Sequence, residues 1–214
     1  AALRAAGAAT LAVDVVMTDK HHAAFCAVRP PGHHAERHAA MGFCFFNNVA
    51  VGAWHAMDRY GLERIAILDF DVHHGNGTED IVAGDERILF GSSFQHPFYP
   101  GSGADSKTPN VINIPLPART DGEAFRAAVE RDWLPRLEAF QPQLVMISAG
   151  FDGHIEDDMA NFNLREADYG WITQQLHDLA KRHAHERIVS CLEGGYNLSA
   201  LGRSVSTHID ELIG

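Results

Sequence analysis

The chain has 214 residues, of which 46% are hydrophobic and 21% are charged, the proportions of an ordinary globular domain. This composition excludes an intrinsically disordered chain, a collagen and a coiled coil. Lys and Arg total 17 against 28 Asp and Glu, and the resulting formal charge of −11 disfavours direct binding to nucleic acid.

The amino-terminal segment 1–17 is apolar, but Asp14 interrupts it and its only basic residue is Arg4. This pattern favours a helix of the fold over a secretory signal peptide. No stretch of the sequence approaches the roughly 20 uncharged apolar residues that a membrane span needs.

The cysteines are few and far apart: Cys26, Cys44 and Cys191. Because this spacing forms neither a disulfide framework nor a zinc knuckle, we expect a soluble, cytoplasmic protein that does not associate with membranes.

Short apolar runs that are rich in β-branched residues predict buried strands at 24–28, 64–70, 87–90, 111–114, 144–148 and 187–192. Helical patterns lie between or after them, at 47–60, 122–140, 165–183 and 198–212. Continuously apolar strands that alternate with helices are typical of a parallel sheet covered on both faces. We therefore expect an α/β protein whose residues 1–214 form a single three-layer α/β/α domain with a mainly parallel sheet.

Polar clusters stand where the predicted strands end, and the chain has 14 histidines, more than core packing needs. The clusters are at 33–34, 69–74, 92–93, 149–152 and 193–196. The carboxyl ends of parallel strands meet at one edge of a sheet, which is where ligands bind in open α/β folds. These loops therefore predict one site.

Asp69, Asp71 and His73 are spaced two residues apart, so they share one face if the strand end is extended. Carboxylates and an imidazole buried together repel and desolvate one another unless a cation lies among them. Asp152 follows a second hydrophobic strand and, with Asp71 and His73, completes the three protein ligands of a catalytic metal site. The carboxylate-rich set suits Zn²⁺ and also accepts Fe²⁺ or Co²⁺. A metal-free network of Asp–His hydrogen bonds is the alternative interpretation.

His33 and His34 lie in a loop that Pro30, Pro31 and Gly32 make rigid. Imidazole can both activate a water and protonate a leaving amine near neutral pH, so this pair is a candidate for acid–base catalysis. The other close histidine pairs are interpreted as solvated surface groups: His21 with His22, and His183 with His185.

Tyr196 follows Gly194 and Gly195 at the end of the last predicted strand. The two glycines let the backbone approach a ligand closely, and a phenol beside a metal can donate a hydrogen bond to a developing oxyanion. The alternative interpretation of Tyr196 alone is an aromatic residue packed in a loop.

Several long motifs in order together resemble the histone deacetylase family, in the style of its class II and bacterial members. They are RPPGHH (29–34), GFCFFNN (42–48), DFDVHHGNGTED (69–80), YPGSG (99–103), AGFDGH (149–154) and LEGGYN (192–197). The resemblance implies the α/β/α fold that arginases and deacetylases share, and a metal-dependent amidohydrolase activity.

The resemblance also implies roles for individual residues. The metal ligands are Asp71, His73 and Asp152. The catalytic set is His34 as general base, His33 as its electrostatic partner, Asp69 orienting His33, Asn76 behind His34, and Tyr196 polarising the acetyl carbonyl. The substrate channel is lined by Gly42, Phe43, Tyr99 and, at its rim, Met159. A structural potassium ion is implied near Asp69, Asp71, His73, Ser92 and Ser93.

Two features depart from the family pattern. Asn76 stands where class I enzymes have Asp, and since an amide stabilises an imidazolium less than a carboxylate does, we expect a lower pKa for His34. The family's domain begins well upstream of Ala1, so we expect this chain to be the incomplete record of a longer protein; a protein that began at Ala1 is expected to leave one side of the sheet uncovered.

We therefore predict a zinc-dependent deacetylase that acts on acetyl-lysine side chains of proteins or peptides. An amidohydrolase of acetylpolyamines or other small acetylated amines is the alternative, which Met159 disfavours and the acidic run 156–158 favours. A catalytically silent module that binds acyl-lysine is an alternative of another class, and a metal-free structural domain is a third. A homo-oligomer is compatible with the sequence.

Overall fold

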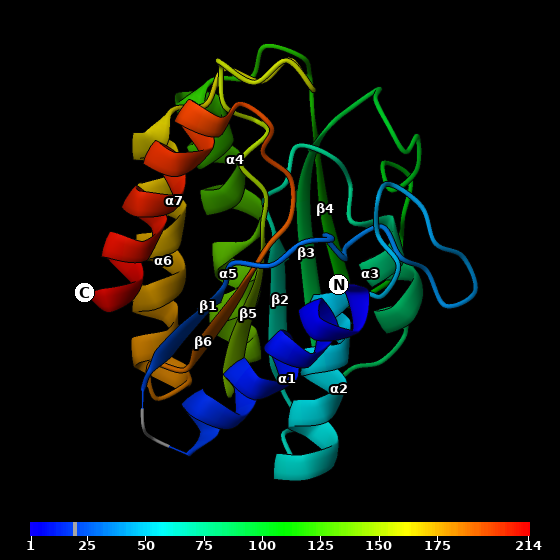
Figure 1. The fold of residues 1–214 in the computed structure, drawn as a ribbon, viewed down its shortest axis with the longest axis vertical. Helices are drawn as coiled ribbons and strands as arrows, with labels where there is room; N and C mark the ends of the chain where they lie inside the picture. The colour runs from blue at the N-terminus through cyan, green and yellow to red at the C-terminus, as the bar shows by residue number, and fades with distance from the viewer. Residues whose placement is uncertain (19–20) are drawn as a thin grey trace.

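A single parallel sheet forms the centre of the molecule (Figure 1). The computed structural model describes residues 1–18 and 21–214. The strands are β1 (Ala23–Cys26), β2 (Ile65–Asp69), β3 (Ile88–Gln95), β4 (Val111–Leu116), β5 (Leu144–Ala149) and β6 (Ile188–Leu192). They lie in the order β1-β6-β5-β2-β3-β4, and every neighbouring pair is parallel. The predicted α/β class is confirmed.

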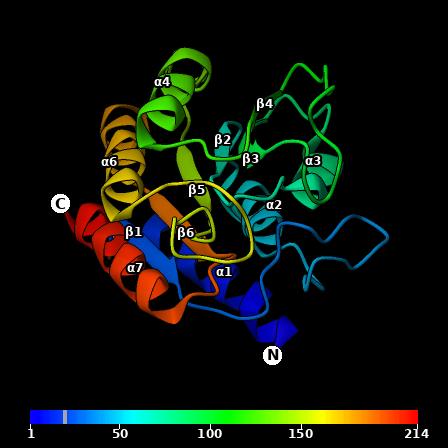
Figure 2. The same cartoon turned by 90° about the horizontal axis from the view of Figure 1, so that it is seen from above.

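Helices cover both faces of this sheet. They are α1 (Ala2–Met17), α2 (Asn48–Tyr60), α3 (Asn76–Val82), α4 (Gly122–Asp132), α5 (Leu134–Phe140), α6 (Glu166–His183) and α7 (Leu198–Ile213). Seen from above, the sheet separates α1 and α2 from α4, α6 and α7 (Figure 2). In the described residues both faces of the sheet are thus covered, whereas a protein that began at Ala1 was expected to leave one side uncovered. Where the protein begins stays a prediction.

Strand β2 explains why the sheet needs helices on both sides. Its side chains alternate between the faces, so Ile65 and Ile67 join the apolar cluster under α1 and α2. Ala66 and Leu68 join the cluster under α4, α5, α6 and α7. All of β2 is buried, which accounts for its continuous apolar run.

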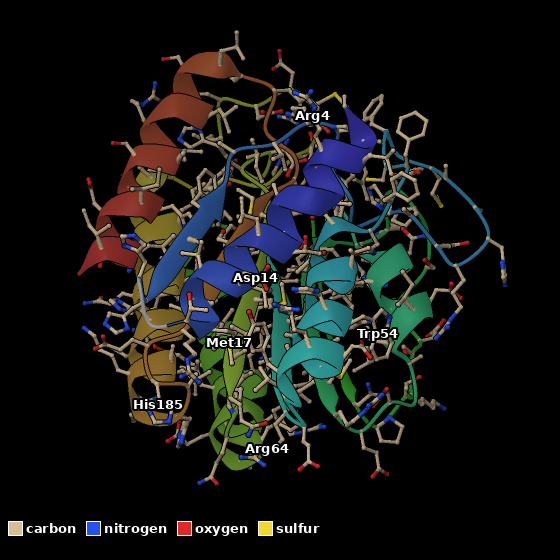
Figure 3. The ribbon with its side chains drawn as sticks, turned by 60° about the horizontal axis from the view of Figure 1, so that its bottom comes forward. Arg4, Asp14, Met17, Trp54, Arg64 and His185 are labelled. Atoms are coloured by element: carbon tan, nitrogen blue, oxygen red, sulfur yellow. The ribbon has the colours of Figure 1, made fainter. Side chains whose placement is uncertain are left out.

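The amino-terminal segment is a helix of the fold, as expected. Alanines on the buried side of α1 allow it to pack closely against α2 and the sheet. Figure 3 shows α1 running beside α2, with Asp14 between them. The Asp14 carboxylate lies 2.7 Å from Nε2 of His55 and accepts a hydrogen bond from the Tyr60 hydroxyl at 2.8 Å. Among the described helices, none combines the length and apolarity that crossing a bilayer requires.

The predicted helix 122–140 is two helices, α4 and α5, which is a correction to the sequence analysis. Pro135 stands in the first turn of α5, and proline lacks the N–H that would continue the hydrogen-bond ladder of α4. Trp133 at the junction is fully buried and donates its indole N–H to the carbonyl of Ile112 at 3.1 Å. The break therefore also anchors α4 and α5 to β4.

The carboxyl ends of the strands meet at the upper edge of the sheet in Figure 1, where the loops after β5 and β6 rise. Asp69 at the end of β2 is level with Ser92 of β3 and Ser148 of β5. Strand β3 is longer than predicted and continues to Gln95, so Ser92 and Ser93 lie within a strand rather than in a loop. Asp69 likewise ends a strand and Asn76 begins α3, and the loops of this edge hold the other predicted site residues.

His208 is a buried histidine on α7 that packs against residues of that edge, with its ring centroid 6.0 Å from that of Phe70 and 5.7 Å from that of Phe151. Its Nδ1 lies 2.6 Å from the Thr173 hydroxyl and its Nε2 lies 2.9 Å from the Ser190 hydroxyl. Thr173 donates its own hydrogen to the carbonyl of Tyr169, so Nδ1 of His208 donates to Thr173 and Nε2 accepts from Ser190. Burial lowers the pKa of His208 to about 3.

We predict that His208 makes the protein less stable in mild acid. Between the ordinary histidine pKa of about 6.5 and about pH 3, this histidine is protonated in the unfolded chain but neutral in the native state. Stability therefore falls as the pH falls through this window. The slope amounts to about 1.4 kcal/mol per pH unit. Urea unfolding at pH 5.0, 5.5 and 6.0 should show a shallower slope for His208→Gln than for the wild type. Identical slopes would contradict the assignment, whatever the absolute stability of the variant.

Candidate active site

Three predicted metal ligands converge at the carboxyl edge of the sheet. Nδ1 of His73 lies 3.1 Å from Oδ1 of Asp71 and 3.2 Å from Oδ2 of Asp152, and all three residues are buried. Donors that bind one tetrahedral Zn²⁺ at its usual bond lengths are about 3.3–3.6 Å apart. The spacing of these atoms therefore fits a single divalent ion.

Local hydrogen bonds build this arrangement. The backbone N–H of Asp71 donates to Oδ1 of Asp69 at 3.1 Å, and the N–H of His73 donates to Oδ1 of Asp71 at 2.9 Å. These are successive turns in which each Asp side chain binds the residue two positions on. Strand β2 ends at Asp69, so the expected extended conformation through His73 is wrong, although the three side chains still come together. Asp152 joins them by accepting from the N–H of Val72 at 3.1 Å.

Four carboxyl groups are buried at the site, those of Asp69, Asp71, Asp152 and Glu193. Burial raises the pKa of Asp69 and of Asp152 to about 6, and burial raises the pKa of Glu193 to about 7. Burial acts against the charge on His73, but the carboxylates of Asp152 and Asp71 outweigh it and raise its pKa to about 10. A divalent cation would relieve the crowding of carboxylates, so the chemistry of the donor set also fits a metal.

The two predicted catalytic histidines are held in different ways. Nδ1 of His33 lies 2.9 Å from Oδ2 of Asp69, and Nδ1 of His34 lies 2.8 Å from Oδ1 of Asn76. Burial lowers the pKa of His33, but Asp69 and Asp71 outweigh it and raise that pKa well above its ordinary value. The two environments therefore give the neighbouring imidazoles different charge states at neutral pH, with His33 protonated.

His34 is the neutral member of the pair. Burial and the charge of His33 lower the pKa of His34 to about 3. The hydrogen bond between Nδ1 of His34 and Oδ1 of Asn76 acts to raise this pKa but is outweighed. That an Asp at position 76 would give His34 a higher pKa stays a prediction. A neutral His34 can accept a proton at pH 7.

Two glycines allow the backbone to pass close to these groups. The N–H of Gly194 donates to Oδ2 of Asp71 at 2.8 Å, and a Cβ at this position would lie 2.0 Å from Oδ2 of Asp152. A Cβ on Gly42, which has a φ of 54°, would lie 2.2 Å from Cδ2 of His34. Any larger residue at either position would displace the predicted machinery.

A pocket of about 400 Å³ reaches His73, one of the predicted metal ligands. It is lined by Pro31, His33, His34, Gly42, Phe43, His73, Phe98, Tyr99, Met159, Gly194 and Tyr196. Phe43 is 65% exposed and has a φ of 66°, a conformation that bulky residues rarely adopt and that is concentrated at functional sites. All four predicted channel residues thus line one cavity, and its aromatic walls suit an apolar chain.

The structure adds residues that the sequence analysis missed. Phe98 stacks on His73 with ring centroids 5.5 Å apart and forms part of the pocket wall. Arg29 donates to the carbonyls of Glu193 and Gly195, at 2.8 and 3.0 Å, and its guanidinium lies 5.8 Å from the ring of Tyr196. Phe98 directly precedes the motif at 99–103, and Arg29 is the first residue of the motif at 29–34. These positions were the available signal.

Asp157 fixes the loop that carries Tyr196. One oxygen of this buried carboxylate accepts from the N–H of Tyr196 at 2.6 Å and from the N–H of Asn197 at 2.9 Å. Its other oxygen accepts from the N–H of Met159 at 3.0 Å. The predicted oxyanion donor and the rim of the channel are therefore held by one side chain.

A second group of acidic residues and a histidine is unsuited to a metal. Nδ1 of His154 accepts from the backbone N–H of Glu156 at 3.1 Å, so the neutral ring carries its proton on Nε2, the only nitrogen left for a metal. Arg203 already pairs with Glu156 at 2.7 Å and with Glu166 at 2.5 Å. The cluster is an ion-pair network that joins the site loop to α6 and α7.

The comparisons with known proteins agree with this geometry. The model of the histone deacetylase domain matches residues 1–212. The chain therefore belongs to the histone deacetylase family.

Individual relatives are similar over nearly all of the chain. It is 43% identical to "Type-2 histone deacetylase 2" of Dictyostelium discoideum, over 100% of the chain and 14% of that protein. It is 41% identical to "Polyamine deacetylase HDAC10" of Mus musculus, over 98% of the chain and 33% of that protein. The crystal structure of the HDA15 HD domain superposes with a TM-score of 0.92 at 36% identity, over 98% of this chain and 61% of that one. The chain thus spans less than two thirds of each of these proteins.

We predict that the protein binds one equivalent of Zn²⁺ and that Asp152→Ala removes most of it, because the substitution deletes a ligand and leaves two donors. Glu166→Ala is the matched control, since it removes a carboxylate from the second cluster and should leave the metal content unchanged. Elemental analysis after dialysis of folded protein measures both. A full metal equivalent in Asp152→Ala would overturn the ligand assignment.

Proposed function

We propose that the protein is a zinc-dependent deacetylase that hydrolyses the acetamide of acetyl-lysine side chains in proteins or peptides. The observation that carries this proposal is the pocket whose lining combines aromatic side chains with His34 and His73, whose ring centroids lie 6.0 Å apart. An acetylated lysine has a matching shape, with an apolar stem and a reactive amide at its end. Membership of the histone deacetylase family supports the same reaction.

In this proposal each group has a defined role in the reaction. Zn²⁺, held by Asp71, His73 and Asp152, would supply Lewis-acid activation of the water and the acetyl carbonyl. The neutral His34 takes a proton from the attacking water at Nε2 and returns it to the nitrogen of the leaving amine as the C–N bond breaks. The hydroxyl of Tyr196 donates to the carbonyl oxygen as that oxygen becomes negative.

The acidic run beside the rim bears on the substrate class. Asp157 is committed to backbone N–H groups, and Glu156 pairs with Arg203 at 2.7 Å. Asp158 is exposed, and its side chain makes no hydrogen bond or ion pair among the described contacts. Met159, which lines the pocket, offers no charge to a second ammonium. These features favour acetyl-lysine over an acetylpolyamine, which remains the second candidate because of the likeness to the mouse polyamine deacetylase.

Comparison of two substrates tests this choice. We expect kcat/KM for an acetyl-lysine peptide to exceed that for N-acetylputrescine by about tenfold or more, since the pocket rim provides apolar contact rather than a charge for the second amine. Asp158→Asn should leave the peptide reaction unchanged. Preferred turnover of N-acetylputrescine, weakened by Asp158→Asn, would favour the polyamine reaction instead.

We also propose a structural potassium ion beside β2 and β3. Asp69 and Ser92 are register partners in these strands, and Asp71 and His73 follow directly. The hydroxyl of Ser93 is buried and has no hydrogen-bond partner among the described residues. An ion bound mainly by backbone oxygens would use this position to link the metal ligands to the sheet.

Tyr196→Phe tests whether the protein is an enzyme or a catalytically silent module that binds acyl-lysine. The variant keeps the ring but loses a donor used mainly in the transition state, so kcat should fall by about 10²–10³ while binding of the acetylated peptide is nearly unchanged. Steady-state kinetics together with calorimetric titration measure the two quantities. Turnover within about threefold of wild type contradicts the oxyanion role. Binding without any turnover by the metal-loaded wild type would favour the module.

A further inference from the structure

A side chain outside the predicted catalytic set contacts Asn76 from the side opposite His34. Oδ1 of Asn76 lies 2.8 Å from Nδ1 of His34, while Nδ2 of Asn76 donates to Oε1 of Glu36 at 2.7 Å. The same Nδ2 donates to Sδ of Met41 at 3.2 Å. His34, Asn76 and Glu36 therefore form one hydrogen-bonded chain that ends on a carboxylate.

This chain matters because an asparagine amide can face His34 in two ways. If the oxygen faces Nδ1, the neutral imidazole carries its hydrogen on Nδ1 and has a free lone pair on Nε2. If the NH₂ group faces Nδ1, the hydrogen moves to Nε2, and the ring cannot accept a proton there. A carboxylate in place of Asn76 has no donor and would not face this choice.

Glu36 removes the ambiguity. An ionised carboxylate only accepts hydrogen bonds, and the thioether sulfur of Met41 is likewise an acceptor. Turning the Asn76 amide over would set its oxygen against Oε1 of Glu36 at the 2.7 Å contact and would leave both acceptors without a donor. The amide oxygen is thereby directed to His34.

The fold holds Glu36 at this position. The N–H of Glu36 donates to the carbonyl of Ala39 at 2.9 Å, which closes a turn directly after the histidine pair. The next residue, Arg37, donates its N–H to Oδ2 of Asp80 at 2.9 Å and its Nε to the carbonyl of Asp80 at 3.0 Å. Asp80 lies on α3, the helix that begins at Asn76. One end of α3 thus carries the amide while its next turn anchors the loop of Glu36.

We propose that Glu36 is a positioning residue that locks the Asn76 amide and so keeps His34 in the tautomer with its hydrogen on Nδ1. The effect on turnover rests on the proposed deacetylase function, whereas the tautomer of His34 can be observed without any turnover. Glu36 acts through Asn76 and does not line the pocket.

Nitrogen-15 NMR of histidine-labelled, zinc-loaded protein at pH 7 observes the tautomer directly, with His34 assigned by its loss in His34→Gln. We expect a protonated Nδ1 and an unprotonated Nε2 in the wild type. In Glu36→Ala the hydrogen should appear on Nε2 for a large share of the molecules. Glu36→Gln, whose side chain can accept or donate, should lie between them. Arg37→Ala is the matched control, since it removes a side-chain contact of the same loop but keeps the backbone N–H bond to Asp80 that anchors it, so the tautomer should be unchanged.

Kinetics on the acetyl-lysine peptide provide the second readout. Glu36→Ala should lower kcat by about five- to tenfold, the effect expected of one misdirected hydrogen bond, with KM nearly unchanged. Adding Asn76→Asp to Glu36→Ala should restore most of the lost kcat, because a carboxylate cannot present a donor to His34. A merely structural role for Glu36 would not be rescued in this way.

The outcomes are distinguishable. A wild-type tautomer in both Glu36→Ala and Glu36→Gln overturns the inference even if the enzyme is fully active. If Glu36→Ala does not fold, the Glu36→Gln spectrum and kcat decide it: values equal to those of wild type overturn it, and a mixed tautomer with reduced kcat supports it. A shifted tautomer in a protein that has no deacetylase activity at all supports the role of Glu36 and contradicts the proposed function.

Discussion

The crowding of buried carboxylates at one edge of the sheet is the constraint on which the rest of this site depends. Asp69, Asp71, Asp152 and Glu193 are all fully buried, and an uncompensated charge in such a place is costly. Protonated His33, backbone N–H groups and a divalent cation are the available compensations. The close glycines follow from the same constraint, because they let the N–H donors reach the carboxylates.

The parallel sheet makes this crowding possible. Strands β1, β2, β5 and β6 are neighbours in space although their sequences are far apart, and each delivers a loop to the same edge. Two apolar clusters on opposite faces hold the sheet rigid, so the loops begin from fixed points. The ion-pair network of Arg203 and the carboxylate of Asp157 then fix the loop that bears Tyr196.

Much of the site could be predicted from the sequence because its ligands follow directly from strand ends. The D-x-D-x-H spacing and the Asp after β5 are visible in one dimension, and the parallel topology then brings them together. The roles of Glu36, Arg29 and Phe98 could not be predicted, because each depends on a contact between loops that no periodicity encodes. The division of 122–140 could have been predicted, since Pro135 is a helix breaker in the middle of that segment.

The central claim is that Asp71, His73 and Asp152 hold a divalent ion without which the pocket performs no chemistry. Its most direct test is to strip the purified protein with a chelator, verify metal loss by elemental analysis, and titrate Zn²⁺ back while measuring hydrolysis of an acetyl-lysine peptide. The account predicts no turnover by the metal-free protein and a rate that rises linearly and saturates at one equivalent. Undiminished hydrolysis by verified metal-free protein would contradict it.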